Sequence, residues 1–402
     1  MVRVDRLLRG AGEVFTGGPD GILTDVSVGM SEGVITYIGP PSDVEASEVI
    51  DLDGRLLTPG LVDPHTHLVF AGDRADEYAL RAAGTSYLQI AKAGGGIART
   101  MRATRAASAD ALAALARPRL DALLRCGVTT AEVKSGYGLT LDDELKMLEV
   151  VRRLDAEQPI ALVATFLGAH TVPPEARGDR QGYLDRVVDE MIPAVAAAGL
   201  AAFCDVFVEE GAFTLDEAER VLRAGIAHGL RPKVHADQLS PGGGAELAAR
   251  LRAVSADHLE HVSDFGIKLL AEAGTVAVLL PGAAMFLGGD ERPPARALID
   301  HGVPVALATD CNPGTCMTEN LLLMLTLGMS RLGMTPVEVL DAVTRHAARA
   351  VGREAVAGTI ALGRPADLAV FDVPSHRHLP YRFGAIPTWQ VYKDGERVYA
   401  AG

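Results

Sequence analysis

The most informative stretch of this sequence is Leu61-Val62-Asp63-Pro64-His65-Thr66-His67, in which an apolar run leads directly into two histidines. This arrangement is typical of the end of a β-strand. Alternate residues of a strand project to the same face, about 7 Å apart at Cα, so both imidazoles can reach one cation. Two strand-end histidines bonded to the backbone are the other interpretation, and the pair alone does not decide between them.

Two further apolar runs, 232–235 and 303–308, also lead into a possible metal ligand. Three imidazoles and one carboxylate at strand ends form a site that leaves a position open for water. A divalent cation lowers the pKa of that water to about 7, which yields hydroxide at neutral pH. We therefore expect a catalytic metal site. The expected ligands are His65, His67, His235 and Asp310.

Composition restricts the possible partners and the cellular setting. The net charge of −14 over 402 residues argues against nucleic acid or an anionic membrane as a partner. The sequence begins without the apolar segment of a secretory signal, and no uninterrupted apolar run approaches 18 residues. The four cysteines show no C-x-x-C spacing and are too few for a disulfide framework. We expect a reduced, cytoplasmic setting.

The middle of the chain alternates strand-like and helix-like segments. The strand-like runs are 60–62, 128–133, 160–167, 203–208, 232–235, 253–256, 275–280 and 303–308. Helical spacing is present in 112–124, 141–154, 183–197, 215–227 and 246–251. Eight such units predict an α/β fold, a TIM (β/α)8 barrel with its chemistry at the C-terminal ends of the strands. A doubly wound open sheet is the alternative, but no glycine-rich nucleotide-binding motif supports it.

Both ends of the chain contain short strands that are punctuated by glycine, proline and aspartate. Neither end is long enough for a good core of its own. We expect residues 1–57 and 356–402 to pair in one small composite β-sandwich domain, which would place the chain ends together. Residues 58–355 would then form the catalytic barrel.

Residues near the ends of strands 4 and 5 narrow the chemistry. The fourth strand-like run ends at Val208-Glu209 without a lysine, so the carbamate that bridges two metals in some related sites has no candidate there, which favours one metal. Metal-dependent deaminases of this architecture usually carry a glutamate where this chain has Gln238, and an amide cannot shuttle a proton. His258, after the sixth run, is expected behind the ligands as a proton carrier or carbonyl polariser.

Several segments resemble the imidazolonepropionases of histidine degradation, a family within the amidohydrolase superfamily. They include Pro64-His65-Thr66-His67 with Arg74, Glu132-Val133-Lys134-Ser135-Gly136-Tyr137-Gly138, residues 166–175, His235-Ala236-Asp237-Gln238, residues 255–259, and Thr309-Asp310-Cys311-Asn312-Pro313-Gly314-Thr315. The resemblance implies one zinc or iron ion per chain and a homodimer. It implies ring opening of 4-imidazolone-5-propanoate to N-formimino-L-glutamate, with hydroxide made at the metal attacking the ring carbonyl.

The resemblance also implies roles for individual residues. Those expected to act in catalysis are His258, Asp310 and Gln238. Those expected to bind substrate are Arg74, Tyr137, His170, Gln238, Asn312, Gly314 and Thr315. Gln238 departs from members of the family that carry glutamate there, so its catalytic role stays open.

Two other functions are compatible with the same architecture. A deaminase of a purine-like ring would release ammonia, and Gln238 argues against it. A non-catalytic scaffold would typically have lost metal ligands, whereas the expected set is complete in this sequence.

Overall fold

The centre of the molecule is an eight-stranded parallel sheet that is nearly closed into a barrel. The computed structural model describes residues 2–85, 89–90 and 94–402. The strands pair in chain order from the first to the eighth. They are β8 (Leu61–Asp63), β9 (Val128–Lys134), β10 (Ala161–Ala169), β11 (Phe203–Val208), β12 (Arg231–Ala236), β13 (Ser255–His258), β14 (Val276–Leu279) and β15 (Val305–Leu307). All eight predicted strands are confirmed within two residues at each end, and the open-sheet alternative is wrong.

The barrel closes between its first and last strands through the segments that follow them. The backbone N–H of Asp310 donates to the carbonyl of His65 at 3.0 Å, and the N–H of His67 donates to the carbonyl of Cys311 at 3.0 Å. The side chain of Asp63 adds a second link, because it accepts hydrogen bonds from the N–H and the hydroxyl of Thr309 at 3.2 and 2.6 Å. Three of the expected metal ligands, His65, His67 and Asp310, therefore also close the barrel through their backbone.

Helices surround the barrel, and several of them begin at a side-chain cap. Thr214 and Glu217 form a complete capping box at the start of α8, and the side chain of Ser108 caps α4. The helices that follow the strands are α4 (Ala109–Arg125), α5 (Leu141–Glu157), α6 (Arg180–Arg186), α7 (Ile192–Ala197), α8 (Leu215–Ala227), α9 (Gly244–Arg250), α10 (Asp264–Ala273), α11 (Pro281–Leu287), α12 (Ala295–Asp300), α13 (Leu321–Leu332), α14 (Pro336–Ala342) and α15 (Arg345–Ala350). Additional elements are α1 (Ala75–Ala82), α3 (Ile97–Ala106), α16 (His378–Tyr381), and the 3₁₀ turns Pro41–Asp43 and Pro174–Ala176.

One predicted helix differs from the structure. The helix expected over 183–197 is divided into α6, a π-helical turn at Val187–Met191, and α7. Pro193 lies in the first turn of α7 and has no N–H to donate, so the regular hydrogen-bond ladder cannot run through this position. The other four predicted helices are confirmed.

Two further sheets are built from the chain ends. One contains β1 (Val2–Arg9), β4 (Ser27–Ser31), β5 (Val34–Gly39) and β6 (Val44–Asp51). The other contains β2 (Glu13–Phe15), β3 (Ile22–Leu23), β7 (Leu56–Pro59), β16 (Leu368–Phe371), β17 (Thr388–Lys393) and β18 (Glu396–Ala400). In the second sheet β7 pairs with both β2 and β16, so N- and C-terminal strands share one sheet, as predicted. The exact division at residues 57/58 and 355/356 stays a prediction.

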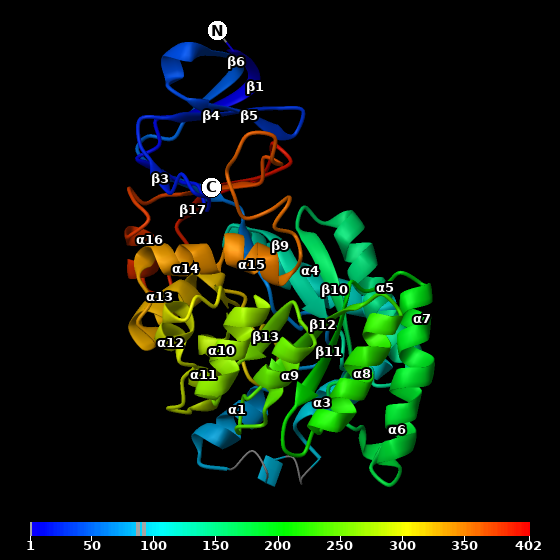
Figure 1. Ribbon diagram of the computed structural model, residues 1–402. Coiled ribbons are helices and arrows are strands. Elements are labelled where there is room, and N and C mark those ends of the chain that lie inside the picture. Colours follow the sequence, from blue (N-terminus) through cyan, green and yellow to red (C-terminus); the bar gives the residue numbers. More distant parts are fainter. Residues whose placement is uncertain (1, 86–88, 91–93) are drawn as a thin grey trace.

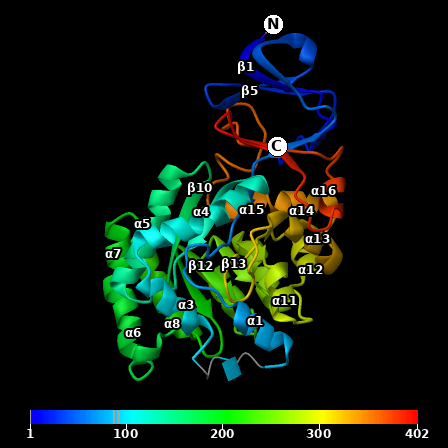
Figure 2. The same cartoon turned by 180° about the vertical axis from the view of Figure 1, so that it is seen from behind.

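The small sheets and the helices α1 and α3 lie at opposite ends of the molecule (Figure 1). The view from behind shows the same arrangement, with both chain termini among the small sheets (Figure 2). No helix in the described part of the chain is long and apolar enough to cross a membrane.

The link between Asp63 and Thr309 leads to a stability prediction. Asp63→Ala should lower the free energy of unfolding by about 2 kcal/mol or more, because two buried donors of Thr309 lose their acceptor. Denaturant unfolding measures the change. The matched control is Asp300→Ala on the surface of α12, where Asp300 pairs with Arg296, and the midpoint should barely move. Equal shifts in the two variants would contradict this account of the barrel closure.

Candidate metal centre

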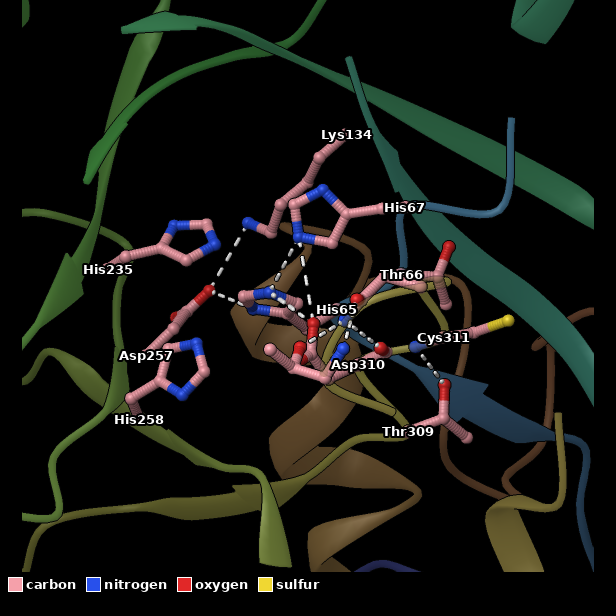
Figure 3. A network of polar contacts seen from close by, with 12 residues as sticks. His65, Thr66, His67, Lys134, His235, Asp257, His258, Thr309, Asp310 and Cys311 are labelled. Carbon is pink, nitrogen blue, oxygen red and sulfur yellow. Dashed lines mark hydrogen bonds and ion pairs between the residues drawn. The ribbon is translucent and has the colours of Figure 1, made fainter. Parts of the chain in front are cut away.

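Four histidines and one aspartate converge at the C-terminal ends of four strands. His65 and His67 follow β8, His235 lies in β12, His258 is the last residue of β13, and Asp310 follows β15. All five side chains are buried. Figure 3 shows them around one small region, with the ring of His65 at its centre. The barrel therefore brings together all four of the expected metal ligands and also His258, which was expected to lie behind them.

Three of these residues have donor atoms spaced as metal ligands are. His65 Nε2 lies 3.3 Å from His67 Nε2 and 3.5 Å from Asp310 Oδ1, and His67 Nε2 lies 3.7 Å from the same oxygen. A tetrahedral zinc ion with ligands at about 2.0–2.2 Å separates its donor atoms by about 3.3–3.6 Å. His65, His67 and Asp310 therefore have the spacing of a set that could hold an ion.

His65, His235 and His258 form a second such group. The ring centroid of His65 lies 4.6 Å from that of His235, and the rings of His235 and His258 are 5.4 Å apart. Nε2 of His235 is buried and has no hydrogen-bond partner among the residues that the structure describes. His65 belongs to both groups. His258 therefore lies within the histidine cluster, whereas the sequence placed it behind the ligands.

The backbone at this site is unusual for non-glycine residues. His258 has a φ of 82° and Asp310 a φ of 52°, both in the left-handed region. Such conformations cost free energy and persist where the surrounding structure enforces them, which is commonly at functional sites. Thr315 also holds Asp310, because its hydroxyl lies 3.2 Å from Oδ2 of that carboxylate.

Two buried carboxylates orient the histidines from behind. Oδ2 of Asp257 lies 2.7 Å from Nδ1 of His65, and Oδ2 of Asp205 lies 3.0 Å from Nδ1 of His235. The contact at His65 is a hydrogen bond, and a carboxylate bonded to Nδ1 in this way places the proton there and leaves Nε2 as the ligand atom. Neither aspartate was singled out from the sequence.

Two lysines and a glutamate complete this buried charged layer. Nζ of Lys134 lies 2.8 Å from Asp205 and 3.2 Å from Asp257, while Lys233 pairs with Glu132 at 2.7 Å. All five side chains have no solvent exposure. The signal for them was available in the sequence, since charged residues interrupt strands that are otherwise apolar.

Burial controls the protonation of the cluster. It lowers the pKa of His65, His67 and His258 well below the ordinary value, which favours the neutral imidazole that a metal requires. Burial also disfavours the charged form of a carboxyl group, and it raises the pKa of Asp310 to about 7. Burial would lower the pKa of Lys134, but the neighbouring carboxylates raise it above its usual value, so this side chain is an ammonium ion.

Tyr137 and His170, two of the expected substrate-binding residues, lie beside the cluster. The ring of His170 stacks on that of His67 at 5.4 Å, and the ring of Tyr137 lies 5.9 Å from His67. Nδ1 of His170 lies 3.0 Å from the carbonyl of Gly136, and burial lowers the pKa of His170 to about 4. A neutral His170 and Tyr137 thus lie next to the expected metal ligands.

Glu144 positions the loop that carries Tyr137, and sequence reasoning missed it. Its buried carboxylate accepts hydrogen bonds from the backbone N–H groups of Gly136, Gly138 and Leu139, at 2.8–3.2 Å. The apolar spacing of α5 gave no reason to expect a glutamate that faces inward from its first turn.

Arg74 lies against the loop that follows Asp310. Its Nε donates to Glu77 at 2.8 Å, and a Cβ placed on Gly314 would lie only 2.2 Å from its Nη1. A glycine is therefore required at position 314 for the guanidinium to occupy this place.

Asn312 and Gln238 were both expected to bind substrate, and the structure gives their side chains different surroundings. The amide of Asn312 donates to Asp310 and Thr315 and accepts from the N–H groups of Gly314 and Thr315, so it holds its own loop. Gln238 is partly exposed in the loop after β12, and its side chain makes no hydrogen bond within the described ranges. Substrate contacts by Asn312 and Gln238 stay predictions.

Residues 56–400 match the amidohydrolase family. An imidazolonepropionase of Geobacillus thermodenitrificans is 49% identical over 95% of this chain and 92% of its own length. Another, of Caulobacter vibrioides, is 54% identical over 91% of this chain and 92% of its own length. Among solved structures, a zinc-bound adenosine deaminase of Xanthomonas campestris is similar with a TM-score of 0.75 and 19% identity, over 98% of this chain and 93% of that one. Identity this low shows the fold alone.

The contact between Asp257 and His65 leads to a prediction about metal affinity. Asp257→Asn keeps the shape of the side chain but replaces the carboxylate that makes His65 a stronger ligand, so affinity for zinc should fall about 10- to 100-fold. Competition with a chelating dye measures it. Asp264→Asn, the same change at an exposed residue of α10, serves as the control. Unchanged affinity in the Asp257 variant would show that this carboxylate does not tune the ligand.

Proposed function

The chain belongs to the amidohydrolase family and, within it, to the imidazolonepropionases, and we propose that it opens the ring of 4-imidazolone-5-propanoate to N-formimino-L-glutamate at a single zinc or iron ion. One observation carries the proposal. A complete, buried cluster of histidines and an aspartate lies at the strand ends of a chain that is about half identical to imidazolonepropionases over most of its length.

The residues present fit a transition-metal ion. The proposed ligands are His65, His67, His235 and Asp310. Neutral imidazoles and one carboxylate suit zinc or iron, and the unpartnered Nε2 of His235 supplies the kind of buried donor that a ligand would satisfy. When bound, such an ion acidifies a coordinated water to a pKa of about 7 and polarises a carbonyl oxygen.

Asp310 and His258 are proposed to move the protons. The second oxygen of Asp310, steadied by Thr315, can take up the proton that the attacking water loses. His258 stands within the histidine cluster and can polarise the ring carbonyl or assist the departing nitrogen as the lactam C–N bond breaks. The fixed backbone at both residues holds these groups in place before substrate arrives.

Arg74 is proposed to bind the propionate of the substrate. Glu77 fixes one edge of the guanidinium through Nε, and Nη1 lies beside Gly314 in the loop that follows Asp310. A guanidinium can bind a carboxylate with two parallel hydrogen bonds. Tyr137 and His170 would contact the ring, because both lie against His67.

The remaining expectations concern surroundings and assembly. The chain carries no excess of positive charge that would favour nucleic acid or an anionic membrane. We propose a cytoplasmic enzyme, which agrees with four buried cysteines that form no disulfide. The homodimer likewise stays a prediction.

The substrate assignment can be tested directly. Purified protein should convert 4-imidazolone-5-propanoate to N-formimino-L-glutamate without releasing ammonia. The absorbance of the substrate ring should disappear as the product accumulates. The analogue that lacks the carboxylate should be a poor substrate, because its hydrogen bonds to the guanidinium of Arg74 would be lost. Ammonia release from guanine, adenine or cytosine, with no action on the imidazolone, would instead identify a deaminase.

The role of His258 has its own test, because the structure groups it with His65 and His235. His258→Asn should lower kcat by about 10²- to 10⁴-fold while the metal content stays unchanged. Elemental analysis and steady-state kinetics measure the two effects. His301→Asn at the exposed end of α12 is the control and should change neither. Loss of the metal from the His258 variant would move this residue into the ligand set.

A further inference from the structure

Lys134 holds an ammonium group among three carboxylates directly behind the histidines. Its Nζ lies 2.8 Å from Asp205, 3.1 Å from Glu132 and 3.2 Å from Asp257. All four side chains have no solvent exposure. Figure 3 shows the lysine entering the cluster beside His67, with its Nζ directed at Asp257. Three anionic oxygens around a buried cation are the surroundings that a bound divalent metal ion also has.

The oxygens around this ammonium also contact the histidines. Oδ2 of Asp257 lies 2.7 Å from His65, and Oδ2 of Asp205 lies 3.0 Å from His235. The same two oxygen atoms are the ones closest to Nζ of Lys134 in each aspartate. The ammonium is therefore one layer behind the proposed ion and is linked to two of its ligands.

Two of the three carboxylates around Lys134 also belong, with His65, to a group that has the spacing of a metal site. Atoms of His65, Glu132 and Asp257 all lie within 4.8 Å of one another, and all three residues are buried. Such an oxygen-rich set suits a hard divalent cation such as Mn²⁺. The ammonium already supplies a positive charge at the centre of the carboxylates, so a second metal ion meets repulsion and no vacant space.

We propose that the ammonium of Lys134 takes the position of a second metal ion and thereby limits the chain to one ion. The proposal rests on the proposed function, which supplies the first ion at His65, His67, His235 and Asp310. It identifies a latent site for an oxygen-preferring divalent cation, formed by Glu132, Asp205 and Asp257. Truncating the lysine should expose this site, because the three carboxylates would then lack their shared cation.

Lys233 provides a matched control. It is equally buried and also pairs with Glu132, at 2.7 Å, but its other close polar neighbour is the carbonyl of Pro64 at 3.4 Å. Lys233→Ala therefore removes a buried positive charge from the same layer without vacating the centre of the three carboxylates. It should not create a second site.

The experiment counts metal ions in full-length protein. Metal-free wild type, Lys134→Ala and Lys233→Ala are each loaded with one equivalent of Zn²⁺, dialysed to equilibrium against Mn²⁺, and analysed for both elements. We expect one bound ion in wild type and in Lys233→Ala, and two in Lys134→Ala, with Mn²⁺ as the additional ion. If Lys134→Ala is unstable without metal, Mn²⁺ should raise its melting temperature more than that of Lys233→Ala.

The outcomes separate this proposal from the proposed function. One ion or none in Lys134→Ala, with one in wild type, or an equal effect of Mn²⁺ on the two melting temperatures, would overturn the latent site and leave the first ion intact. No bound ion in any of the three proteins would instead contradict the proposed function itself. Two ions in the wild type would contradict the limit to one ion.

Discussion

A charged side chain that is buried in the protein needs oppositely charged neighbours, and the structure at the centre of the barrel depends on this constraint. Five fully buried charged residues lie behind the histidines and form ion pairs with one another and with the cluster. Removing one partner would leave an uncompensated charge, which is strongly destabilising. The layer therefore fixes Asp257 and Asp205, and these in turn fix the rings of His65 and His235.

The site and the fold share atoms at the point where the barrel closes. The carbonyl of His65 and the N–H of Asp310 form one of the bonds that join the first strand to the last. Asp63 and Thr309 form another immediately beside it. The proposed ligands thus sit on rigid backbone, and a functional constellation held in this way is organised before any ion or substrate binds.

The sequence predicted the barrel and the position of the cluster for the same physical reason. Apolar runs that end in histidine or aspartate mark strands, and a parallel barrel collects the C-terminal ends of its strands on one face. The charged layer was not predicted, because the approach of Lys134 to Asp257 depends on the curvature of the whole barrel and not on local pattern. The hydrogen bonds of Asn312 were not predicted either, since its amide holds the loop that follows Asp310, and its contact with substrate stays a prediction.

The position of the bound ion tests the account most directly. Anomalous diffraction from crystals of the metal-loaded protein, measured at the absorption edge of the bound element, locates every metal ion in the chain. The account predicts a single peak in contact with His65, His67, His235 and Asp310, with the ammonium of Lys134 behind it. A peak coordinated by His258, or a second peak among Glu132, Asp205 and Asp257, would contradict it.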